Sequence, residues 1–319
     1  MSVCAVMLVK DEVDIIRFTV EHLLGQVDHI IIQDNASHDG TNAHVYDLAA
    51  KHQGLITVHE DPELGYFQDR KTTALAREAF DRGFSWVLPC DADEYWYAPD
   101  GRPIREWLMG VAPDVQIVTA DLYNHLPTAV DVAAHDEPNP FLRMGWRQRE
   151  HGTLPKVCCR TRPDLRIHMG NHGASVDGVA LTIGGLVIRH YSWRSTDQYV
   201  RKIRNGEAAY AATDMHPSVG QHWRMWASHS DEEVADHFRQ WFWALNPAAD
   251  DSLIYDPAPF AERSTMAETP EERVARLRAT REELLASGEV DPELGTDHLD
   301  EQIAEAEGTS LLGDGSPRD

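Results

Sequence analysis

Four apolar runs alternate with three stretches of helical character in the first 97 residues. The apolar runs cover residues 3–9, 29–33, 54–59 and 86–88. Continuous apolar runs of this length are typical of strands buried on both faces of a sheet. The stretches between them, around 13–25, 42–52 and 66–82, carry apolar residues at helical spacing. Alternation of this kind predicts an α/β fold with a mostly parallel sheet and right-handed crossovers.

Three carboxylates follow the fourth apolar run within four positions. Asp91 and Asp93 lie on the same side of an extended chain, and Glu94 comes next. Two converging carboxylates favour a positive partner, and Mg²⁺ or Mn²⁺ prefers oxygen ligands of this type. Open α/β sheets bind ligands at this end of their strands. An isolated Asp-x-Asp is more often a solvated turn, so the neighbouring motifs decide between the two interpretations.

Two further polar motifs follow the first and second apolar runs. The motifs are Lys-Asp-Glu at 10–12, Asp-Asn-Ala-Ser-His-Asp-Gly-Thr at 34–41 and, after the fourth run, Asp-Ala-Asp-Glu at 91–94. In this order and spacing they resemble a bacterial branch of the family-2-type glycosyltransferases of the GT-A fold. The resemblance covers residues 1–97. It extends over 139–225 through Pro-Lys-Val at 155–157, Gly-Asn-His at 170–172 and His-Tyr-Ser-Trp-Arg-Ser at 190–195.

The resemblance implies that the chain binds a nucleotide-sugar donor, which we expect to be a UDP-sugar, with Mn²⁺ or Mg²⁺ as cofactor. It assigns Asp93 as a direct metal ligand and places Asp91 near the donor ribose and the metal's waters. A histidine from a late strand completes the metal site in many GT-A enzymes. We therefore expect His190 as the second ligand, with His172 as the alternative. Because the strand end is polar, we also expect Asp93 to lie near the surface.

Other residues are expected to contact the nucleotide. The resemblance implies that Asp34 and Glu12 bind the base or ribose, and Lys10 belongs to the same motif as Glu12. Arg70 and Lys71 open the third helical stretch, where a cation can bind diphosphate; a solvated helix face is the equally common alternative. Asp39 and Gly40 are typical of a turn, and Glu94 is either a supporting group or an exposed turn residue.

The resemblance implies inversion at the anomeric carbon, which requires a general base near the acceptor hydroxyl. The carboxylate signature usual in the family after the metal motif is absent from this chain. We rank Glu150 first, because it precedes the Pro-Lys motif at 155–156, then Asp121 at a strand end, then His172. The arginines near Glu150 would hold its pKa down and make it a weaker base.

Later segments carry weaker patterns. They predict helices over 104–109, 195–212, 232–244 and 270–286, strands over 115–122 and 181–190, and a hairpin from 156–162 and 165–172. Gly184 and Gly185 predict a bulge in the strand over 181–190, and residues 123–140 a long loop. For the tryptophans between 223 and 243, packing in the core is favoured over stacking on sugars.

We expect a glycosyltransferase domain over 1–225. It divides into a nucleotide-binding half over 1–97 and a half over 98–225 that binds the acceptor and completes the metal site. A helical region over 226–307 and a disordered tail over 308–319 follow.

Composition limits the partners. Acidic residues number 53 and basic residues 29, and the net charge of −24 opposes binding to duplex nucleic acid or anionic membranes. The four cysteines show no metal or disulfide spacing, which favours reduced thiols in a cytoplasmic protein. The apolar run 2–9 follows no basic segment and is too short for a signal peptide or a membrane span. The sequence gives no prediction of oligomeric state.

Two other functions remain open. A non-catalytic nucleotide- or glycan-binding protein can share the fold, since fold does not imply function. A sugar nucleotidyltransferase also uses carboxylates and Mg²⁺, but it usually has a glycine-rich basic first loop, and residues 10–12 are not one. The acceptor stays open among a glycan, a lipid-linked sugar, a small metabolite and a modified nucleobase.

Overall fold

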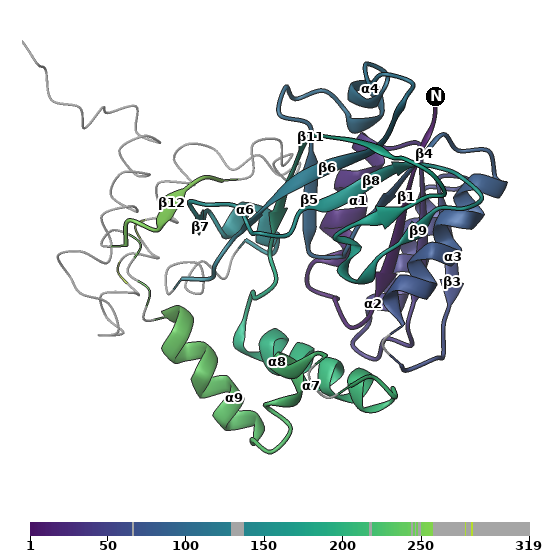
Figure 1. Cartoon of the computed structure of the whole chain (residues 1–319). Helices are drawn as coiled ribbons and strands as arrows, with labels where there is room; N and C mark the ends of the chain where they lie inside the picture. The colour runs from purple at the N-terminus through teal and green to yellow at the C-terminus, as the bar shows by residue number, and fades with distance from the viewer. Residues whose placement is uncertain are drawn as a thin grey trace, which may run out of the picture.

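An eight-stranded sheet forms the centre of the computed structural model, which describes residues 1–65, 67–128, 137–216, 219–243, 245, 247, 250–257, 278 and 282. The strand order is β3-β2-β1-β4-β8-β6-β11-β5 (Figure 1). The strands are β1 (Val3–Val9), β2 (His29–Asp34), β3 (Ile56–Glu60), β4 (Trp86–Pro89), β5 (Glu94–Tyr97), β6 (Val115–Asn124), β8 (Lys156–Arg160) and β11 (Leu181–His190). β8 and β5 run against their neighbours and the other six strands run in one direction. The predicted mostly parallel α/β sheet is confirmed.

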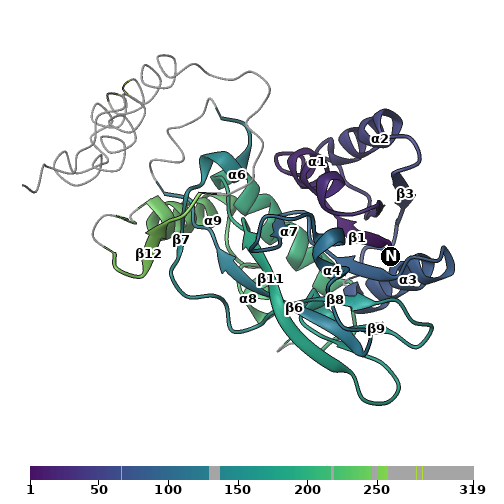
Figure 2. The same cartoon turned by 90° about the horizontal axis from the view of Figure 1, so that it is seen from above.

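Helices lie on both faces of this sheet (Figure 2). The described helices are α1 (Ile16–Gln26), α2 (Thr41–Lys51), α3 (Gln68–Asp81), α4 (Ile104–Leu108), α6 (Pro140–Arg143), α7 (Thr196–Ala211), α8 (Gln221–Arg224) and α9 (Asp231–Phe238). A 3₁₀ turn covers Met169–Asn171 and a π-helical turn Arg239–Trp243. Two small antiparallel pairs join β9 (Arg166–Ile167) with β10 (Ala174–Ser175), and β7 (Trp146–Gln148) with β12 (Leu253–Tyr255).

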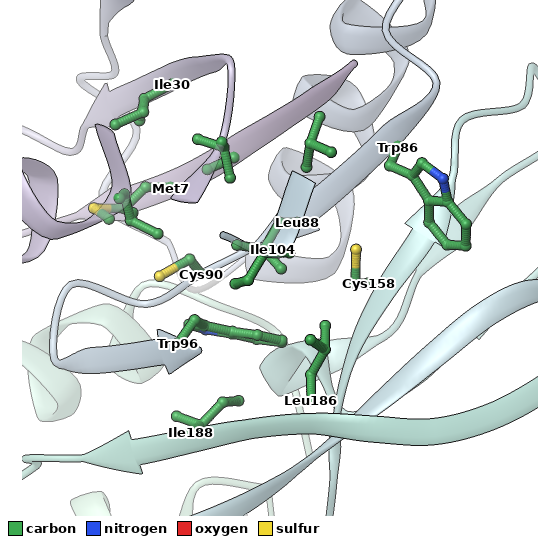
Figure 3. Packing of buried hydrophobic residues seen from close by; sticks show 14 of the residues in the cluster. Met7, Ile30, Trp86, Leu88, Cys90, Trp96, Ile104, Cys158, Leu186 and Ile188 are labelled. Carbon is green, nitrogen blue, oxygen red and sulfur yellow. The ribbon is translucent and has the colours of Figure 1, made fainter. Parts of the chain in front are cut away.

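Alternation along β1 explains why helices cover both faces. Val3, Ala5, Met7 and Val9 point into one core together with residues of α1, α2 and α4. The intervening Cys4 and Val6 point into a second core with α3. A strand of a parallel sheet buries both faces, which is why its sequence is apolar throughout. Figure 3 shows the first core, where Trp96 of β5 lies between residues of β4 and β11.

The helices α7 and α9 pack on one another at one end of the molecule (Figure 1). Their shared core is formed by Tyr199, Ile203, Val234 and Phe238, with Phe242 beside them. Trp223 and Trp226 pack against this core, as the core interpretation predicts, whereas Trp241 is 65% exposed. The side chain of Trp243 is outside the described residues.

Several predicted elements are confirmed closely. β1 and β11 have the predicted bounds, and β11 changes register between Gly184 and Leu186, which confirms the bulge. Ser195 caps α7, its hydroxyl accepting from the backbone N–H of Gln198. The four cysteines are buried and unpaired, as expected of reduced thiols. None of the described helices combines the length and the apolar composition that a membrane crossing needs.

The predicted hairpin over 156–172 is wrong. β8 inserts between β4 and β6 in the main sheet, and β9 pairs instead with β10. The sequence analysis also missed β5, because four residues directly after an acidic turn are too few to show a period. β6 continues to Asn124, two residues past the predicted end. Three predicted segments lie outside the described residues: positions 129–136 of the long loop, the helix over 270–286 except for residues 278 and 282, and the tail over 308–319.

Candidate functional site

Six strands end at one edge of the sheet because they run in the same direction. β1 ends before residues 10–12, β2 at Asp34, β4 before residues 91–94, β6 at Asn124 and β11 at His190. The three motifs and the late histidine are therefore collected at a single edge, as expected for a ligand site in an open α/β sheet. The pairing of β5 with β11 refines this arrangement, since Glu94 lies opposite His190 and the backbone N–H of Tyr191 donates to the carbonyl of Asp93.

Asp93 and His190 converge at this edge. Asp93 Oδ1 lies 3.6 Å from His190 Nε2, and the two side chains are 4% and 20% exposed. His190 Nδ1 lies 2.9 Å from the carbonyl oxygen of the Asn124 side chain and donates to it. The lone pair of Nε2 is thereby left to accept from the Ser192 hydroxyl, whose Oγ lies 2.8 Å away. The expectation that Asp93 lies near the surface is wrong, because β5, β11 and α7 enclose it.

Asp93 stays ionised despite its burial. Burial alone would raise the pKa of Asp93, but Lys202, His190 and Arg194 outweigh it and hold the pKa well below its usual range. Lys202 Nζ contacts Asp93 Oδ2 directly and lies 3.1 Å from Glu12 Oε1. Arg194 is fully buried, with Nη1 3.9 Å from Asp93 Oδ2. Asp93 is thus a buried carboxylate surrounded by cations.

Arg194 is fixed by several partners. Its guanidinium donates to both carboxylate oxygens of Asp14, at 2.7 and 2.9 Å, and to the carbonyl of Tyr191 at 2.8 Å. It also pairs with Glu12. A planar guanidinium suits a buried network of this type, because all of its donors can be satisfied at once. Arg194 therefore joins the loop after β1 to the segment after β11.

Asp91 has a different environment from Asp93. Its Oδ2 lies 2.5 Å from Lys156 Nζ, and its Oδ1 accepts from Gln68 at 3.2 Å and Asn171 at 3.1 Å. Both oxygens are engaged by protein donors, although the side chain is 27% exposed. This arrangement suits a group that contacts a ligand hydroxyl at its exposed side better than a direct metal ligand.

Glu94 supports Asp91 and is not an exposed turn residue. Its side chain is fully buried, and its Oε2 accepts from the backbone N–H of Asp91 at 3.1 Å and from the indole of Trp96 at 2.9 Å. Its Oε1 lies 2.8 Å from Lys156 Nζ. Glu94 therefore fixes the acidic turn from inside the protein, as the supporting role predicts.

The donor set fits a divalent cation only in part. Among the residues that the structure describes, no three or more His, Cys, Asp or Glu side chains form a group that could hold a metal ion. Asp93 and His190 nevertheless supply one ionised carboxylate and one imidazole lone pair on adjacent strands. Mg²⁺ and related cations commonly take one or two protein ligands and complete their shell with phosphate oxygens and water. The two residues therefore fit a cation that is bound together with a diphosphate.

Asp34 and Glu12, which we expect to bind the base or ribose, have different surroundings. Asp34 is 4% exposed; its Oδ2 accepts from the backbone N–H of Ser37 at 3.1 Å, and its Oδ1 is buried without a hydrogen-bond partner in the described part of the chain. Such an orphaned acceptor costs stability unless a ligand donates to it. Glu12 is instead engaged by Arg194 and Lys202.

Three predicted donor-binding cations have distinct surroundings. Lys10 donates to the backbone carbonyls of Asn35 and Ala36, at 2.9 and 3.0 Å, and so ties the first motif to the second. Lys71 is buried, with its Nζ 2.5 Å from Asp61 Oδ2, close to the end of β2. Arg70 has a 60% exposed side chain and pairs with Glu63. This agrees with the alternative that Arg70 belongs to a solvated helix face and does not bind diphosphate.

The turn chemistry predicted for 39–40 is present. Asp39 accepts from the backbone N–H groups of Thr41 and Val13, at 3.0 and 3.1 Å. Gly40 has φ of 104°, a conformation that side chains disfavour. The motif thus holds the loop after β2 against the loop after β1.

The candidate bases differ in position. Glu150 lies exposed after β7, and no hydrogen bond or ion pair connects it to Asp91, Asp93 or His190 within the described ranges. Asp121 is exposed and sits inside β6 rather than at its end. His172 is half-buried beside the acidic turn, and its Nδ1 donates to the carbonyl of Pro155 at 3.0 Å.

His172 has the chemistry of a base at neutral pH. Burial, and then the charge of Lys156, lower the pKa of His172 below its usual value, so the ring is neutral at pH 7. Because Nδ1 carries the proton, Nε2 keeps its lone pair. The ring packs against the face of Gly170, where a methyl group would meet it, and Gly170 has φ of 71°. Position 170 therefore requires glycine, because a side chain would collide with the His172 ring and because the backbone has a positive φ.

The sequence analysis missed Lys156, Arg194 and Lys202 as partners of the carboxylates. A signal for Lys202 exists on α7, where Gln198, Lys202 and Asn205 follow helical spacing on a face next to that of the apolar Tyr199 and Ile203. All three polar side chains reach the site: Gln198 accepts from the backbone of Arg194, Lys202 binds Asp93, and Asn205 donates to Asp11 at 2.8 Å.

Comparisons with known proteins give structural neighbours only. No protein-family model matches the chain, and no curated protein matches it in sequence. Solved structures similar to it include a mannosyltransferase from Pyrobaculum calidifontis in complex with GDP-Man and Mn²⁺, at 16% identity and a TM-score of 0.38, covering 75% of this chain and 73% of that one.

Two further neighbours are glycosyltransferases as well. TarS residues 1–349 of S. aureus, in complex with UDP, has 10% identity and a TM-score of 0.38, covering 99% of this chain and 94% of that one. GalNAc-T7 with UDP, GalNAc and Mn²⁺ has 11% identity and a TM-score of 0.35, covering 76% of this chain and 56% of that one. At these identities the likeness concerns the fold alone.

Proposed function

We propose that this protein is a glycosyltransferase of the GT-A type that moves a sugar from a UDP-sugar to an acceptor hydroxyl with inversion, and that its catalytic domain covers residues 1–225. The observation that carries the proposal is the convergence of Asp93 and His190 at the edge where the nucleotide motifs also end. The ionised carboxylate of Asp93, the imidazole of His190 and the orphaned acceptor Asp34 Oδ1 at the same edge of the sheet suit a nucleotide bound through base and diphosphate.

The roles follow from the contacts. Asp34 would accept from the base or ribose, and Asp91 from a ribose hydroxyl at its exposed side. Asp93 and His190 would hold Mn²⁺ or Mg²⁺, which as a Lewis acid stabilises the negative charge of a departing diphosphate. His172 would take the proton of the acceptor hydroxyl at Nε2.

One experiment distinguishes a glycosyltransferase from the two alternatives, a non-catalytic binding protein and a sugar nucleotidyltransferase. The purified protein is incubated with UDP-sugars and Mn²⁺ without acceptor, and released UDP is measured over time. A glycosyltransferase releases UDP slowly by transfer to water. A binding protein on the same fold binds the UDP-sugar without releasing UDP. A nucleotidyltransferase releases no UDP either, but when pyrophosphate is added it converts the UDP-sugar to UTP and a sugar 1-phosphate.

Base specificity gives a prediction at Asp34. An ionised carboxylate only accepts hydrogen bonds, so it suits the N3–H of uracil or a ribose hydroxyl. We expect UDP to raise the melting temperature more than ADP does, since a ligand at 100 times its Kd adds about 2.7 kcal/mol to the free energy of unfolding. Thermal shift with UDP and ADP measures the difference.

Asp34→Asn is the matched variant, because it keeps the size of the side chain and adds a donor where the base also donates. We expect the preference for UDP to disappear in this variant while the melting temperature without ligand changes little. Equal shifts from both nucleotides in the wild-type protein would contradict the uridine assignment.

A further inference from the structure

Lys202 contacts Oδ2 of Asp93, the carboxylate whose other oxygen, Oδ1, faces His190. Its ammonium lies between two carboxylates: it contacts Asp93 Oδ2 and is 3.1 Å from Glu12 Oε1. Both are residues on which the proposed donor site depends. The same carboxylate cannot hold a lysine ammonium and a divalent cation side by side without repulsion between the two positive charges.

Lys202 is the cation that can move, and Arg194 is not. Arg194 is fully buried and donates to Asp14, Glu12 and the Tyr191 carbonyl. Lys202 is 24% exposed, ends in a single ammonium on a flexible chain, and has the two carboxylates as its described partners. Its Nζ also lies 5.9 Å from the centre of the Trp193 ring.

We propose that Lys202 neutralises Asp93 while the donor is absent and transfers to the donor diphosphate when the nucleotide and the metal enter together. This inference rests on the proposed function. The diphosphate supplies negative charge for the ammonium, and the metal then neutralises Asp93 in its place. One cation then lies against Asp93 in either state, the lysine without donor and the metal with it, and the lysine becomes a diphosphate-binding residue.

The arrangement makes metal binding depend on nucleotide. With Lys202 on Asp93, the described protein ligands left to a metal are one shared carboxylate and His190. Mn²⁺ alone should therefore bind weakly, and UDP should tighten it by supplying phosphate oxygens and by drawing Lys202 away. By thermodynamic reciprocity, Mn²⁺ must tighten UDP by the same factor.

The test uses the full chain and Lys202→Met, which keeps the stem and removes the charge. Binding of Mn²⁺ alone is measured by the electron paramagnetic resonance signal of free Mn²⁺, and binding of UDP in EDTA by calorimetry. We expect Mn²⁺ alone to bind about tenfold more tightly to the variant, because its competitor is gone, and metal-free UDP to bind about tenfold more weakly, because a charge-assisted contact is lost.

Arg201→Met is the matched control. It removes the same charge one residue earlier on α7, but Arg201 faces Asp14 and Asp39, at 4.0 and 3.6 Å, rather than Asp93. Its affinity for Mn²⁺ alone should equal that of the wild-type protein. Lys202→Arg, which keeps a cation, should leave Mn²⁺ binding weak, and Lys202→Gln replaces the Met variant if circular dichroism shows that Met prevents folding.

The outcomes separate the two proposals. Unchanged Mn²⁺ affinity in both Lys202→Met and Lys202→Gln, or an equal rise in Arg201→Met, overturns the exchange of cations even if UDP binds. Absence of any UDP binding by the wild-type protein, with or without Mn²⁺, overturns the proposed function itself. A rise in Mn²⁺ affinity confined to the neutral Lys202 variants supports the exchange.

Discussion

Asp93→Asn should abolish the effect of Mn²⁺ on donor binding and lower the rate of sugar transfer by about 10²–10³-fold. Asparagine keeps the size of the side chain but removes the charge that faces His190 and Lys202. A divalent cation then loses its one ionised protein ligand. Calorimetry of UDP with Mn²⁺ and with EDTA measures the effect, and the two affinities should become equal.

Asparagine is preferable to alanine at this position because Asp93 is buried among cations. Removing the side chain would leave Lys202 and the fully buried Arg194 without one of their partners, and breaking a buried pair typically costs about 3–5 kcal/mol of stability. Asp91→Asn is the comparison variant: both Asp91 oxygens already accept from protein donors, so the metal effect on UDP binding should persist. A full metal effect in Asp93→Asn would remove Asp93 from the site.

His172→Gln should lower turnover by about 10²-fold or more while leaving the affinity for UDP unchanged, because a general base acts on the acceptor and not on the donor. Nδ1 of His172 donates to the Pro155 carbonyl, and glutamine can keep that contact without supplying a base. Single-turnover rates and UDP calorimetry measure the two effects. The product should have the inverted configuration, as a single displacement requires.

The pH dependence provides a second readout for His172. Burial and the Lys156 charge lower the pKa of His172, so the neutral, basic form persists below the usual histidine range. The acidic limb of kcat/KM should therefore fall below about pH 6.5, the unperturbed value, and should be lost in His172→Gln. Glu150→Gln and Asp121→Asn are the controls, since both residues are exposed. If either control reproduces the loss while His172→Gln keeps wild-type turnover, the base is that carboxylate.

Local patterns in the sequence determined the elements and the edge at which they meet. The apolar run 3–9 gave the bounds of β1, because a strand buried on both faces has no polar residue to obscure its ends. The predicted bounds 181–190 also hold for β11, although its first half is largely exposed and it ends in Arg189 and His190. Ser195 marked the start of α7 through its capping hydroxyl. Since parallel strands end at one edge, the positions of Asp34, Asp93 and His190 on that edge also followed from the sequence.

Tertiary structure decided which charges meet there. Lys202 contacts Asp93 across 109 residues of sequence, and Arg194 contacts Glu12 across 182. Pairings of this separation depend on how α7 and the segment after β11 pack on the sheet, and no local period encodes them. The same holds for β8, whose five residues are equally suited to a hairpin and were placed by the gap between β4 and β6. The sequence determined that carboxylates collect at the edge of the sheet; packing over long separations determined that lysines neutralise them.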